Sequence, residues 1–244
     1  GVFETFRGYN DKLFRLDAHL KRMQSGAAFL GIEVDVAEIE VAVRWTLDES
    51  RLDCARVRLT VTGGQADKAT VVVTVEKYKP PTDDDYRRGL AAVTTTIRRH
   101  SDSQIYRYKT LNQIENSVAL AEARSKGAVE AILFNESGEV SETNRSNIFL
   151  VRNGLLKTPD LNSGILPGIT RDTVLKIAVK NGIETVEGRM TPTEFINADE
   201  VFITSSLIEV MPLTSVDGVI IGSGKIGQVT GLLRLEYQRK LTLA

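Results

Sequence analysis

Apolar residues recur at two different periods in the first part of the chain. Residues 1 to 8 and 12 to 16 alternate as short strands do on either side of a turn at residues 8 to 11, and apolar side chains then follow at helical spacing from Asp17 to Gly31. We therefore predict a β-hairpin followed by a helix that Asp17 caps and Gly31 ends.

A second helix and two long strands are predicted next. Ile39, Val43 and Leu47 lie at helical spacing, and the stretches R-V-R-L-T-V-T and A-T-V-V-V-T-V-E then alternate or run apolar around Gly63 and Gly64. Helices that pack on a small antiparallel sheet form an α+β unit, and this is the fold class that we predict.

One strong compositional break interrupts the chain at residues 79 to 85. The stretch K-P-P-T-D-D-D pairs two prolines, which disfavour both helix and central strand, with an acidic run that is typically solvated. We place a domain linker there. It separates a small N-terminal domain of residues 1 to 79 from a larger domain of residues 80 to 244.

The larger domain is predicted to be rich in β-strands, with helices between them. Turn residues at 135 to 138 and 152 to 154 separate short apolar runs, as tight connections in a partly antiparallel sheet do. Thr191 and Glu194 have the spacing of a capping box, with a proline at the first helical position. The predicted strands are residues 90–97, 105–108, 131–134, 147–151 and 199–205, the predicted hairpin turn is residues 216–219, and the predicted helices are residues 112–126, 169–180 and 225–240.

Composition and charge narrow the classes of function. Of the 244 residues, 42% are hydrophobic and 26% are charged, and the formal net charge of -1 argues against a nucleic-acid partner and against a polybasic membrane surface. We expect a small-molecule partner. Cys54 is the only cysteine in the sequence, so neither an intrachain disulfide nor a cysteine metal cluster can form, and a reducing, cytoplasmic setting fits best.

The two histidines, the longest apolar runs and the beginning of the chain indicate no further site or targeting segment. His19 and His100 are far apart in sequence, so no metal pair is predicted, and each is interpreted as a surface or capping side chain. No apolar run reaches about 18 residues, so neither a membrane span nor a signal peptide is predicted. The opening G-V-F-E-T-F-R looks like a strand already under way. We expect upstream residues to have been removed, to be disordered or to belong to a longer parent.

Lys109 is the first candidate for chemistry. It follows a strand-like run and precedes a helix, in R-Y-K-T-L-N-Q-I-E-N, where a side chain can project into a cleft. A lysine that holds an aldehyde cofactor must be partly desolvated so that its amine can be neutral, and it can then serve as the base for proton transfer. Taken alone, such a position is more typical of a solvated surface lysine.

Glu142 is the second candidate. It lies between a turn and the apolar strand predicted at residues 147 to 151, in a segment suited to burial. A buried carboxylate needs a cationic partner, and a protonated pyridine nitrogen is one that makes its ring an electron sink. The alternative is a rim carboxylate paired with Arg145, and this segment alone does not decide between the two.

The stretch L-P-G-I-T-R at residues 166 to 171 opens a predicted helix directly after a loop. The free N–H groups and the positive end of a helix can hold a phosphate. Gly168 permits close backbone approach, Ile169 and Thr170 offer N–H groups, the Thr170 hydroxyl can add a hydrogen bond, and Leu166 can pack under a ring. The alternative for this stretch is a simple helix start.

Two further residues are weaker candidates for holding the same phosphate. Arg22, on the first predicted helix, can reach a phosphate as a bidentate partner, although alone it is more typical of a solvated helix residue. Ser206, at the end of a predicted strand in T-S-S-L-I-E-V-M-P-L, can supply one hydroxyl, and the alternative is a plain loop serine.

Taken together and in this order, these segments resemble the class IV, or fold-type IV, pyridoxal phosphate (PLP) enzymes. That family includes branched-chain and D-amino acid aminotransferases and aminodeoxychorismate lyases. The likeness spans nearly the whole chain. The matching segments are G-V-F-E-T at residues 1–5, H-L-K-R at 19–22, K-T-L-N at 109–112, E-T-N-R-S-N-I-F at 142–149 and L-P-G-I-T-R at 166–171.

The resemblance implies a role for each candidate residue. It makes Lys109 the Schiff-base lysine and Glu142 the partner of the pyridine nitrogen, and both are expected to be catalytic. It also implies a homodimer that acts on an amino acid and a keto acid. The expected phosphate ligands are Arg22, Ile169, Thr170 and Ser206, Leu166 is expected under the ring, and the expected substrate-binding residues are Phe3, Arg7 and Arg56.

Departures from the family pattern bear on the substrate. The R-x-H carboxylate trap of members that act on D-amino acids is replaced here by G-G-Q-A-D-K-A-T, which weakens that interpretation. Branched-chain enzymes tend to carry a tyrosine and an arginine two residues apart, where we assign Cys54 and Arg56, and a tyrosine five residues after the lysine, where Ile114 stands. Both of these tyrosines are missing, but Arg56 matches the arginine and Arg7 matches another arginine on the substrate side, so we predict an aminotransferase of branched-chain type.

The sequence is also compatible with two other functions. A lyase that releases pyruvate from aminodeoxychorismate is the nearest, because K-T-L-N-Q-I-E-N and the compact length also suit it. A non-catalytic binding protein that keeps the fold is the other, and the abrupt start of the chain gives it some weight. The lyase needs no acceptor keto acid, and the binding protein need not hold the cofactor.

Overall fold

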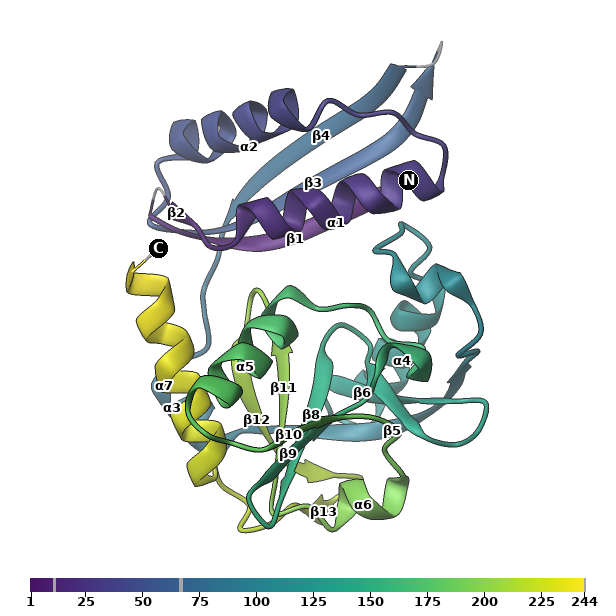
Figure 1. Cartoon of the computed structure of the whole chain (residues 1–244), viewed down its shortest axis with the longest axis vertical. Coiled ribbons are helices and arrows are strands. Elements are labelled where there is room, and N and C mark those ends of the chain that lie inside the picture. The colour runs from purple at the N-terminus through teal and green to yellow at the C-terminus, as the bar shows by residue number, and fades with distance from the viewer. Residues whose placement is uncertain (11, 66–67, 244) are drawn as a thin grey trace. The chain divides into compact units, whose positions relative to one another are not determined.

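The computed structural model describes residues 1–10, 12–65 and 68–243 (Figure 1). Asp11 of the first predicted turn, and Ala66 and Asp67 of the G-G-Q-A-D-K-A-T stretch, lie outside the described residues. The chain forms two compact units. The first contains Gly1–Pro80 together with Tyr108–Asn112, and the second contains Pro81–Arg107 together with Gln113–Leu243.

The first unit is a four-stranded antiparallel sheet in the order β2-β1-β3-β4 with two helices (Figure 1). Its elements are β1 (Val2–Tyr9), β2 (Lys12–Leu13), α1 (Leu16–Phe29), α2 (Val36–Ser50), β3 (Cys54–Gln65) and β4 (Lys68–Lys77). Apolar side chains of α1 and α2 pack with alternate residues of β1 and β3 in one core. This confirms the predicted helices and strands of the N-terminal region, except that the strand predicted at residues 12–16 is limited to Lys12–Leu13.

The two faces of this sheet differ in character. Along β3, Val57, Leu59 and Val61 are fully buried in the core with the helices, whereas Arg56 and Arg58 alternate with them and are only half-buried. Successive side chains of a strand point to opposite faces, so both arginines lie on the face away from the helices.

The prediction that Asp17 caps the first helix is wrong. The helix α1 begins at Leu16, and its N-cap is Arg15, in the left-handed conformation with φ 55° and without a side-chain cap. Asp17 lies inside the first turn, where its negative charge still suits the helix dipole. The second helix has the cap that the first lacks, because the Asp35 side chain accepts hydrogen bonds from the N–H groups of Ala37 and Glu38.

The segment that carries Lys109 joins the first sheet although it comes much later in the sequence. Phe3 N–H donates to the Lys109 carbonyl over 2.9 Å, Leu111 N–H donates to the Gly1 carbonyl over 2.9 Å, and Val2 and Thr110 form an antiparallel bridge. Residues 108–112 thus run beside the first half of β1. The strand predicted at residues 105–108 is wrong, since Gln104–Arg107 forms the 3₁₀ helix η1.

The second unit is built on a mixed sheet of nine strands. The strand order is β10-β9-β8-β11-β12-β5-β6-β7, with β13 paired to β12, and the pairs β5/β6, β5/β12 and β9/β10 are parallel. Its elements are α3 (Asp83–Arg88), β5 (Leu90–Arg99), η1 (Gln104–Arg107), α4 (Ile114–Ser125), β6 (Glu130–Asn135), β7 (Val140–Thr143), β8 (Asn147–Arg152), β9 (Leu155–Thr158), η2 (Leu161–Ser163), α5 (Ile169–Lys180), β10 (Thr185–Glu187), α6 (Pro192–Ile196), β11 (Glu200–Ser205), β12 (Glu209–Val216), β13 (Val219–Ile220) and α7 (Gln228–Leu243).

Most predicted elements of this unit are confirmed within a few residues. The capping box predicted at the start of α6 is present, because the Thr191 side chain accepts from Glu194 N–H while the Glu194 side chain accepts from Thr191 N–H. The acidic run at residues 83–85 is an exception. It forms the first turn of α3, where Thr82 and Asp85 make a second capping box, and acidic residues are favoured there by the helix dipole.

The core of the second unit lies along its central strands. Ile132, Ile148, Leu150, Ile203 and Met211 are almost completely buried in one cluster. The carboxylate and amide side chains of the candidate site project from the same sheet, so a well-packed core fixes their positions. Within the described residues, no helix combines the length and the apolar character needed to cross a membrane.

Candidate functional site

Phe3 lies on the helix-free face of the first sheet, and two cations lie close to its ring. The Arg58 guanidinium carbon is 4.1 Å from the centre of the Phe3 ring, and the Lys109 Nζ is 4.5 Å from the same centre. The aromatic face attracts both cations. The structure therefore brings the predicted Lys109 and Phe3 together, and it adds Arg58, which the sequence analysis did not single out.

Three arginines gather on this face. Arg7 and Arg56 are direct cross-strand partners, and Arg58 is two residues further along β3. Partial burial and the positive charge of Arg56 lower the pKa of the Arg58 guanidinium. Glu76, with its carboxylate 3.4 Å from Arg56, is an acidic neighbour of this trio. The alternation R-V-R already places Arg56 and Arg58 on one face, so period-two spacing was the signal for Arg58.

Arg22 is held by a buried carboxylate on the opposite, helix-covered face. Its Nε donates to Glu4 Oε1 over 2.8 Å and its Nη2 donates to Glu4 Oε2 over 2.7 Å. His19 Nδ1 is 2.8 Å from Glu4 Oε2. The Glu4 side chain is fully buried, and the Arg22 side chain is 13% exposed. Arg22 is a predicted phosphate ligand. The pairing with Glu4 occupies one edge of its guanidinium group and fixes the plane of that group.

The charges of this cluster follow from its geometry. Burial would raise the pKa of the Glu4 carboxyl, but the Arg22 charge and the hydrogen bonds from Arg22 and His19 outweigh burial and lower the pKa to about 2. Burial lowers the pKa of His19, so the imidazole is neutral at pH 7. Because the Glu4 carboxylate can only accept, His19 must carry its proton on Nδ1.

The interpretation of His19 as a surface or capping side chain is wrong. The side chain is only 2% exposed, because it projects from α1 toward the sheet and packs against the buried Glu4 carboxylate and the Phe6 ring. No local pattern predicts this contact, because the partner Glu4 lies on a strand 15 residues earlier in the chain.

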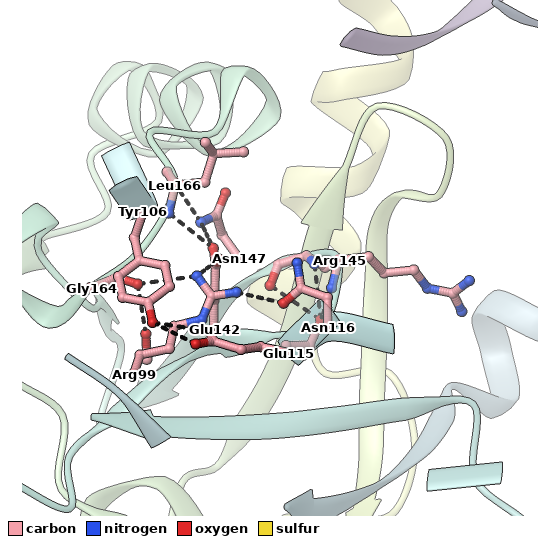
Figure 2. A network of polar contacts seen from close by, with 12 residues as sticks. Arg99, Tyr106, Glu115, Asn116, Glu142, Arg145, Asn147, Gly164 and Leu166 are labelled. Carbon is pink, nitrogen blue, oxygen red and sulfur yellow. Dashed lines mark hydrogen bonds and ion pairs between the residues drawn. The ribbon is translucent and has the colours of Figure 1, made fainter. Parts of the chain in front are cut away.

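Glu142 is the centre of the polar network of the second unit, as Figure 2 shows. Arg99 Nη1 donates to Glu142 Oε1 over 2.6 Å, while Asn147 Nδ2 and Leu166 N–H donate to Glu142 Oε2 over 3.0 and 3.2 Å. The Glu142 side chain is only 8% exposed. A carboxylate that receives three N–H donors, one of them charged, is held in its ionised form.

The alternative partner considered for Glu142 is excluded. The Arg145 side chain points away from Glu142 in Figure 2, and its Nε donates to Glu130 Oε1 over 2.7 Å. The actual partner is Arg99, at the end of β5, which the sequence analysis missed. The pair is separated by 43 residues, and no local pattern links the two side chains.

The start of α5 has the features of an anion site. Its N-cap is Gly168, in an extended conformation, and no side chain of the described residues caps the helix. Ile169 and Thr170 open the helix and are both buried. The first N–H groups of a helix lack partners within the helix, so they can bind an anion.

Gly168 is required at this point by its surroundings. A Cβ on residue 168 would overlap the Asn147 Oδ1 atom. Asn147 Nδ2 donates to both Glu142 and the carbonyl of Leu166, so the glycine permits the contact that joins the helix start to the buried carboxylate.

The remaining predicted ligand, Ser206, lies in the turn between β11 and β12 and is half-buried, and its place at a phosphate stays a prediction. One residue before β11 ends, Thr204 is the cross-strand partner of Asn147. Its hydroxyl is buried and, among the described residues, has no hydrogen-bond partner. Thr204 is a further polar group beside the Glu142 network that the sequence analysis did not single out.

This donor set fits a phosphorylated pyridine cofactor. An ionised, buried carboxylate suits a protonated ring nitrogen, an uncapped helix start suits a phosphate, and the buried Thr204 hydroxyl lacks a partner within the described part of the chain. The fold and these residues together define a cofactor-dependent enzyme with a two-unit α+β architecture.

Comparison with known proteins gives the family. The family model for class IV aminotransferases matches residues 1–216, and the chain belongs to this family. The D-alanine aminotransferase of Bacillus licheniformis is 34% identical over 99% of this chain and 87% of its own length. The aminodeoxychorismate lyase of Bacillus subtilis (strain 168) is 32% identical over 99% of this chain and 85% of its own length.

A solved structure agrees with the sequence relatives. A branched-chain amino acid aminotransferase from T.th., crystallised with pyridoxamine 5′-phosphate, superposes with a TM-score of 0.93 at 30% identity. The match covers 99% of this chain and 85% of that one. These findings confirm the predicted family, the fold-type IV architecture and the assignment to an aminotransferase family of enzymes.

Proposed function

We propose that this chain is a PLP-dependent aminotransferase that moves an amino group between an amino acid of branched-chain type and a 2-keto acid. The observation that carries the proposal is the loop of residues 166–168. The Leu166 N–H donates to the buried Glu142 carboxylate, and two residues later Gly168 is the N-cap of α5, which has no side-chain cap among the described residues. One short loop therefore links a site for a cationic ring nitrogen to a site for a phosphate.

The cofactor ligands follow from this arrangement. Glu142 holds the ring nitrogen in its protonated form, and the N–H groups of Ile169 and Thr170 with the Thr170 hydroxyl hold the phosphate. The family resemblance adds Arg22 and Ser206 to the phosphate ligands and Leu166 under the ring. When bound, PLP supplies an aldehyde that takes up the amino group and a ring that spreads the charge left when the substrate Cα loses its proton.

Lys109 would hold the aldehyde of the cofactor, and once the amino group of the substrate displaces it, its free amine would be the base that accepts the proton from the substrate Cα. Its main chain is fixed by the hydrogen bond from Phe3 N–H, and its amine lies against the Phe3 ring, which is 6% exposed. A lysine fixed at the backbone and shielded on one side by an aromatic ring loses little freedom when it acts.

The arginines of the helix-free face bind the carboxylates of the substrates. Arg7, Arg56 and Arg58 present three guanidinium groups along two neighbouring strands. Every amino acid and keto acid substrate carries a carboxylate, and guanidinium groups bind carboxylates in bidentate geometry. Phe3 provides the apolar surface beside them.

The test is covalent trapping followed by activity. The purified protein is mixed with PLP, its absorbance is recorded before and after borohydride, and the labelled peptide is mapped. We expect reduction to fix the cofactor on Lys109, and Lys109→Ala to lose both the label and the transamination of leucine with 2-oxoglutarate. A Lys109→Ala variant with full transamination would overturn the proposal.

A second candidate is aminodeoxychorismate lyase, favoured by the relative that is 32% identical. Ile114, at the position where a tyrosine is expected in branched-chain enzymes, is 73% exposed at the start of α4 and offers no hydroxyl. Pyruvate release from aminodeoxychorismate without an added keto acid would establish the lyase, whereas dependence of turnover on a keto acid would establish the aminotransferase.

We further propose that the enzyme works as a homodimer in the cytoplasm. The family resemblance supports the dimer, and the single cysteine, Cys54, supports a reducing compartment. Light scattering on the protein as it elutes from a size-exclusion column measures its molar mass. The mass of a monomer for active protein would contradict the dimer.

A further inference from the structure

Arg99 is a buried arginine to which the proposed reaction assigns no role. Its side chain is 4% exposed, which makes it less accessible than the Glu142 carboxylate that it binds. A buried ion pair contributes little net stability, because the loss of hydration offsets the attraction of the charges. Arg99 Nε also has no hydrogen-bond partner among the described residues. A gain in the stability of the fold therefore does not explain why a buried arginine stands at this position.

The contacts of Arg99 fix its orientation from three sides. Nη1 is shared between Glu142 Oε1 and the Gly164 carbonyl, at 2.6 and 3.2 Å, and Nη2 donates to Asn116 Oδ1 over 2.7 Å. Asn116 in turn donates to Gln113 Oε1 over 2.7 Å. These partners come from β7, from α4 and from the loop before α5, and Figure 2 shows Glu142, Asn116 and Gly164 around the Arg99 guanidinium.

An aromatic ring completes the surroundings. The Arg99 guanidinium carbon lies 4.7 Å from the centre of the Tyr106 ring. The Tyr106 hydroxyl donates to both oxygens of Glu115, each at 3.0 Å, which fixes the ring. Tyr106 and Asn116 flank, in sequence, the segment at residues 108–112 that carries Lys109. Arg99 thus contacts residues that precede and follow that segment as well as Glu142.

We propose that Arg99 is a positioning residue that holds the Glu142 carboxylate ionised and in one orientation, so that Glu142 can keep a protonated pyridine nitrogen in place. This inference rests on the proposed function. Asn147 and Leu166 hold Oε2 of the carboxylate with neutral donors, and Arg99 brings a full positive charge to Oε1 over 2.6 Å. Removing a neighbouring cation makes a carboxylate easier to protonate.

The experiment compares Arg99→Gln, Arg99→Lys, Glu142→Gln and the double variant Arg99→Gln/Glu142→Gln in the whole chain loaded with PLP. The measured quantities are kcat and KM for the amino donor across pH, the dissociation constant of PLP from fluorescence titration, and the melting midpoint without cofactor. Arg145→Gln is the matched control, because it removes an arginine whose partner is Glu130.

For Arg99→Gln we expect kcat to fall roughly 10- to 100-fold with little change in KM, as for partners that orient a ligand from behind. The acid limb of the kcat profile should move to higher pH, because Glu142 is then neutralised more readily. Arg99→Lys keeps the charge and should restore the position of the acid limb, with only part of kcat. The double variant should be no slower than Glu142→Gln. Arg145→Gln should keep the kcat and the pH profile of the parent, and only its melting midpoint should fall, because the Glu130 side chain is fully buried.

Three outcomes would overturn the inference. In the first, Arg99→Gln keeps the parent kcat and pH profile. In the second, the two substitutions multiply in the double variant, which would mean that Arg99 does not act through Glu142. In the third, Arg99→Gln lowers only the melting midpoint, which would make its role structural. If Glu142→Gln itself leaves cofactor affinity and kcat unchanged, the proposed function fails together with the inference, so the two failures are distinguishable.

Discussion

The first unit and the second unit each bury a carboxylate against an arginine, and the two pairs are exposed in opposite order. In the first unit Glu4 is fully buried and Arg22 is 13% exposed, so the cation is the outer partner. In the second unit Arg99 is 4% exposed and Glu142 is 8% exposed, so the carboxylate is the outer partner. An outward cation suits an anionic ligand and an outward carboxylate suits a cationic one, as phosphate and pyridinium require.

The two pairs also differ in how they are assembled. The donors to Glu4 come from His19 and Arg22, which lie three residues apart on α1 and so share one face of the helix. The donors to Glu142 come from β5, β8 and the loop before α5. Two adjacent elements are enough to build the first pair, whereas the second requires several strands of the sheet. The Glu4–Arg22 pair can therefore stabilise the first unit as well as take part in binding. The Glu142–Arg99 pair depends on the correct arrangement of several strands, so we expect its main role to be at the site.

The largest expected effect comes from Glu142→Gln. Loss of the negative charge removes the partner of the ring nitrogen, and we expect kcat for transamination to fall roughly 10²- to 10³-fold, about 3–4 kcal/mol of transition-state stabilisation. Steady-state kinetics with saturating PLP measures this. Circular dichroism should show an intact fold, and a variant with kcat near that of the parent would remove Glu142 from the mechanism.

The next effect separates stability from catalysis. Glu4→Ala leaves Arg22 and His19 without their shared acceptor, and we expect the chain to lose about 3 kcal/mol of unfolding free energy, as for other buried pairs that lose one partner. Urea denaturation followed by far-UV circular dichroism measures the change.

Glu76→Gln is the matched control for this variant. It removes the carboxylate of a surface pair with Arg56, in which the Glu76 side chain is 63% exposed, and it should cost under about 1 kcal/mol. Equal losses for Glu4→Ala and Glu76→Gln would show that burial of the Glu4 pair carries no special weight.

The acid dependence of stability should also follow from Glu4. Its pKa falls from the ordinary 4.5 to about 2 in the folded chain, so its contribution is present above pH 4.5 and is lost as the pH falls from 4.5 toward 2. The lowered pKa of His19 acts in the same direction below pH 6.5, because the unfolded chain takes up a proton that the buried ring does not.

The Glu4→Gln variant isolates the Glu4 term. The lowered pKa of Glu4 corresponds to about 3 kcal/mol of unfolding free energy, since each pKa unit is worth about 1.4 kcal/mol. Denaturation midpoints recorded at a series of pH values should fall less steeply between pH 4.5 and 2 in Glu4→Gln than in the parent. Parallel curves for the two proteins would contradict the assignment.

The smallest effect tests the link between the helix start and Glu142. In Gly168→Ala the new methyl group overlaps Asn147 Oδ1, so Asn147 must shift away from Glu142. We expect PLP to bind about tenfold more weakly, or about 1.4 kcal/mol. Gly188→Ala is the control, since the nearest atom to its new methyl is a Val186 side-chain carbon at 3.8 Å. If both variants bind PLP as the parent does, the proposed link between the helix start and Glu142 is wrong.

Much of the candidate site was predictable because its signals are local. The start of α5 at Ile169 follows from a glycine and a loop directly before a helical apolar pattern. The shared face of Arg56 and Arg58 follows from the two-residue period of a strand. The capping box of Thr191 and Glu194 is a fixed spacing. In each case the interacting groups are separated by a few residues, and backbone geometry alone brings them together.

The choice of partner for each buried charge was decided by the tertiary structure. Glu142 had a sequence neighbour, Arg145, three residues away, yet it pairs with Arg99, and Arg145 pairs with Glu130. The reason is that strand pairing sets which side chains meet, and a register between β5, β6 and β7 is a property of the folded sheet. The sequence by itself determined the family, the elements and the types of residue at the site, because these depend on local pattern. The tertiary structure alone decided which charges face each other and which of them lies outermost, because this depends on packing between distant strands.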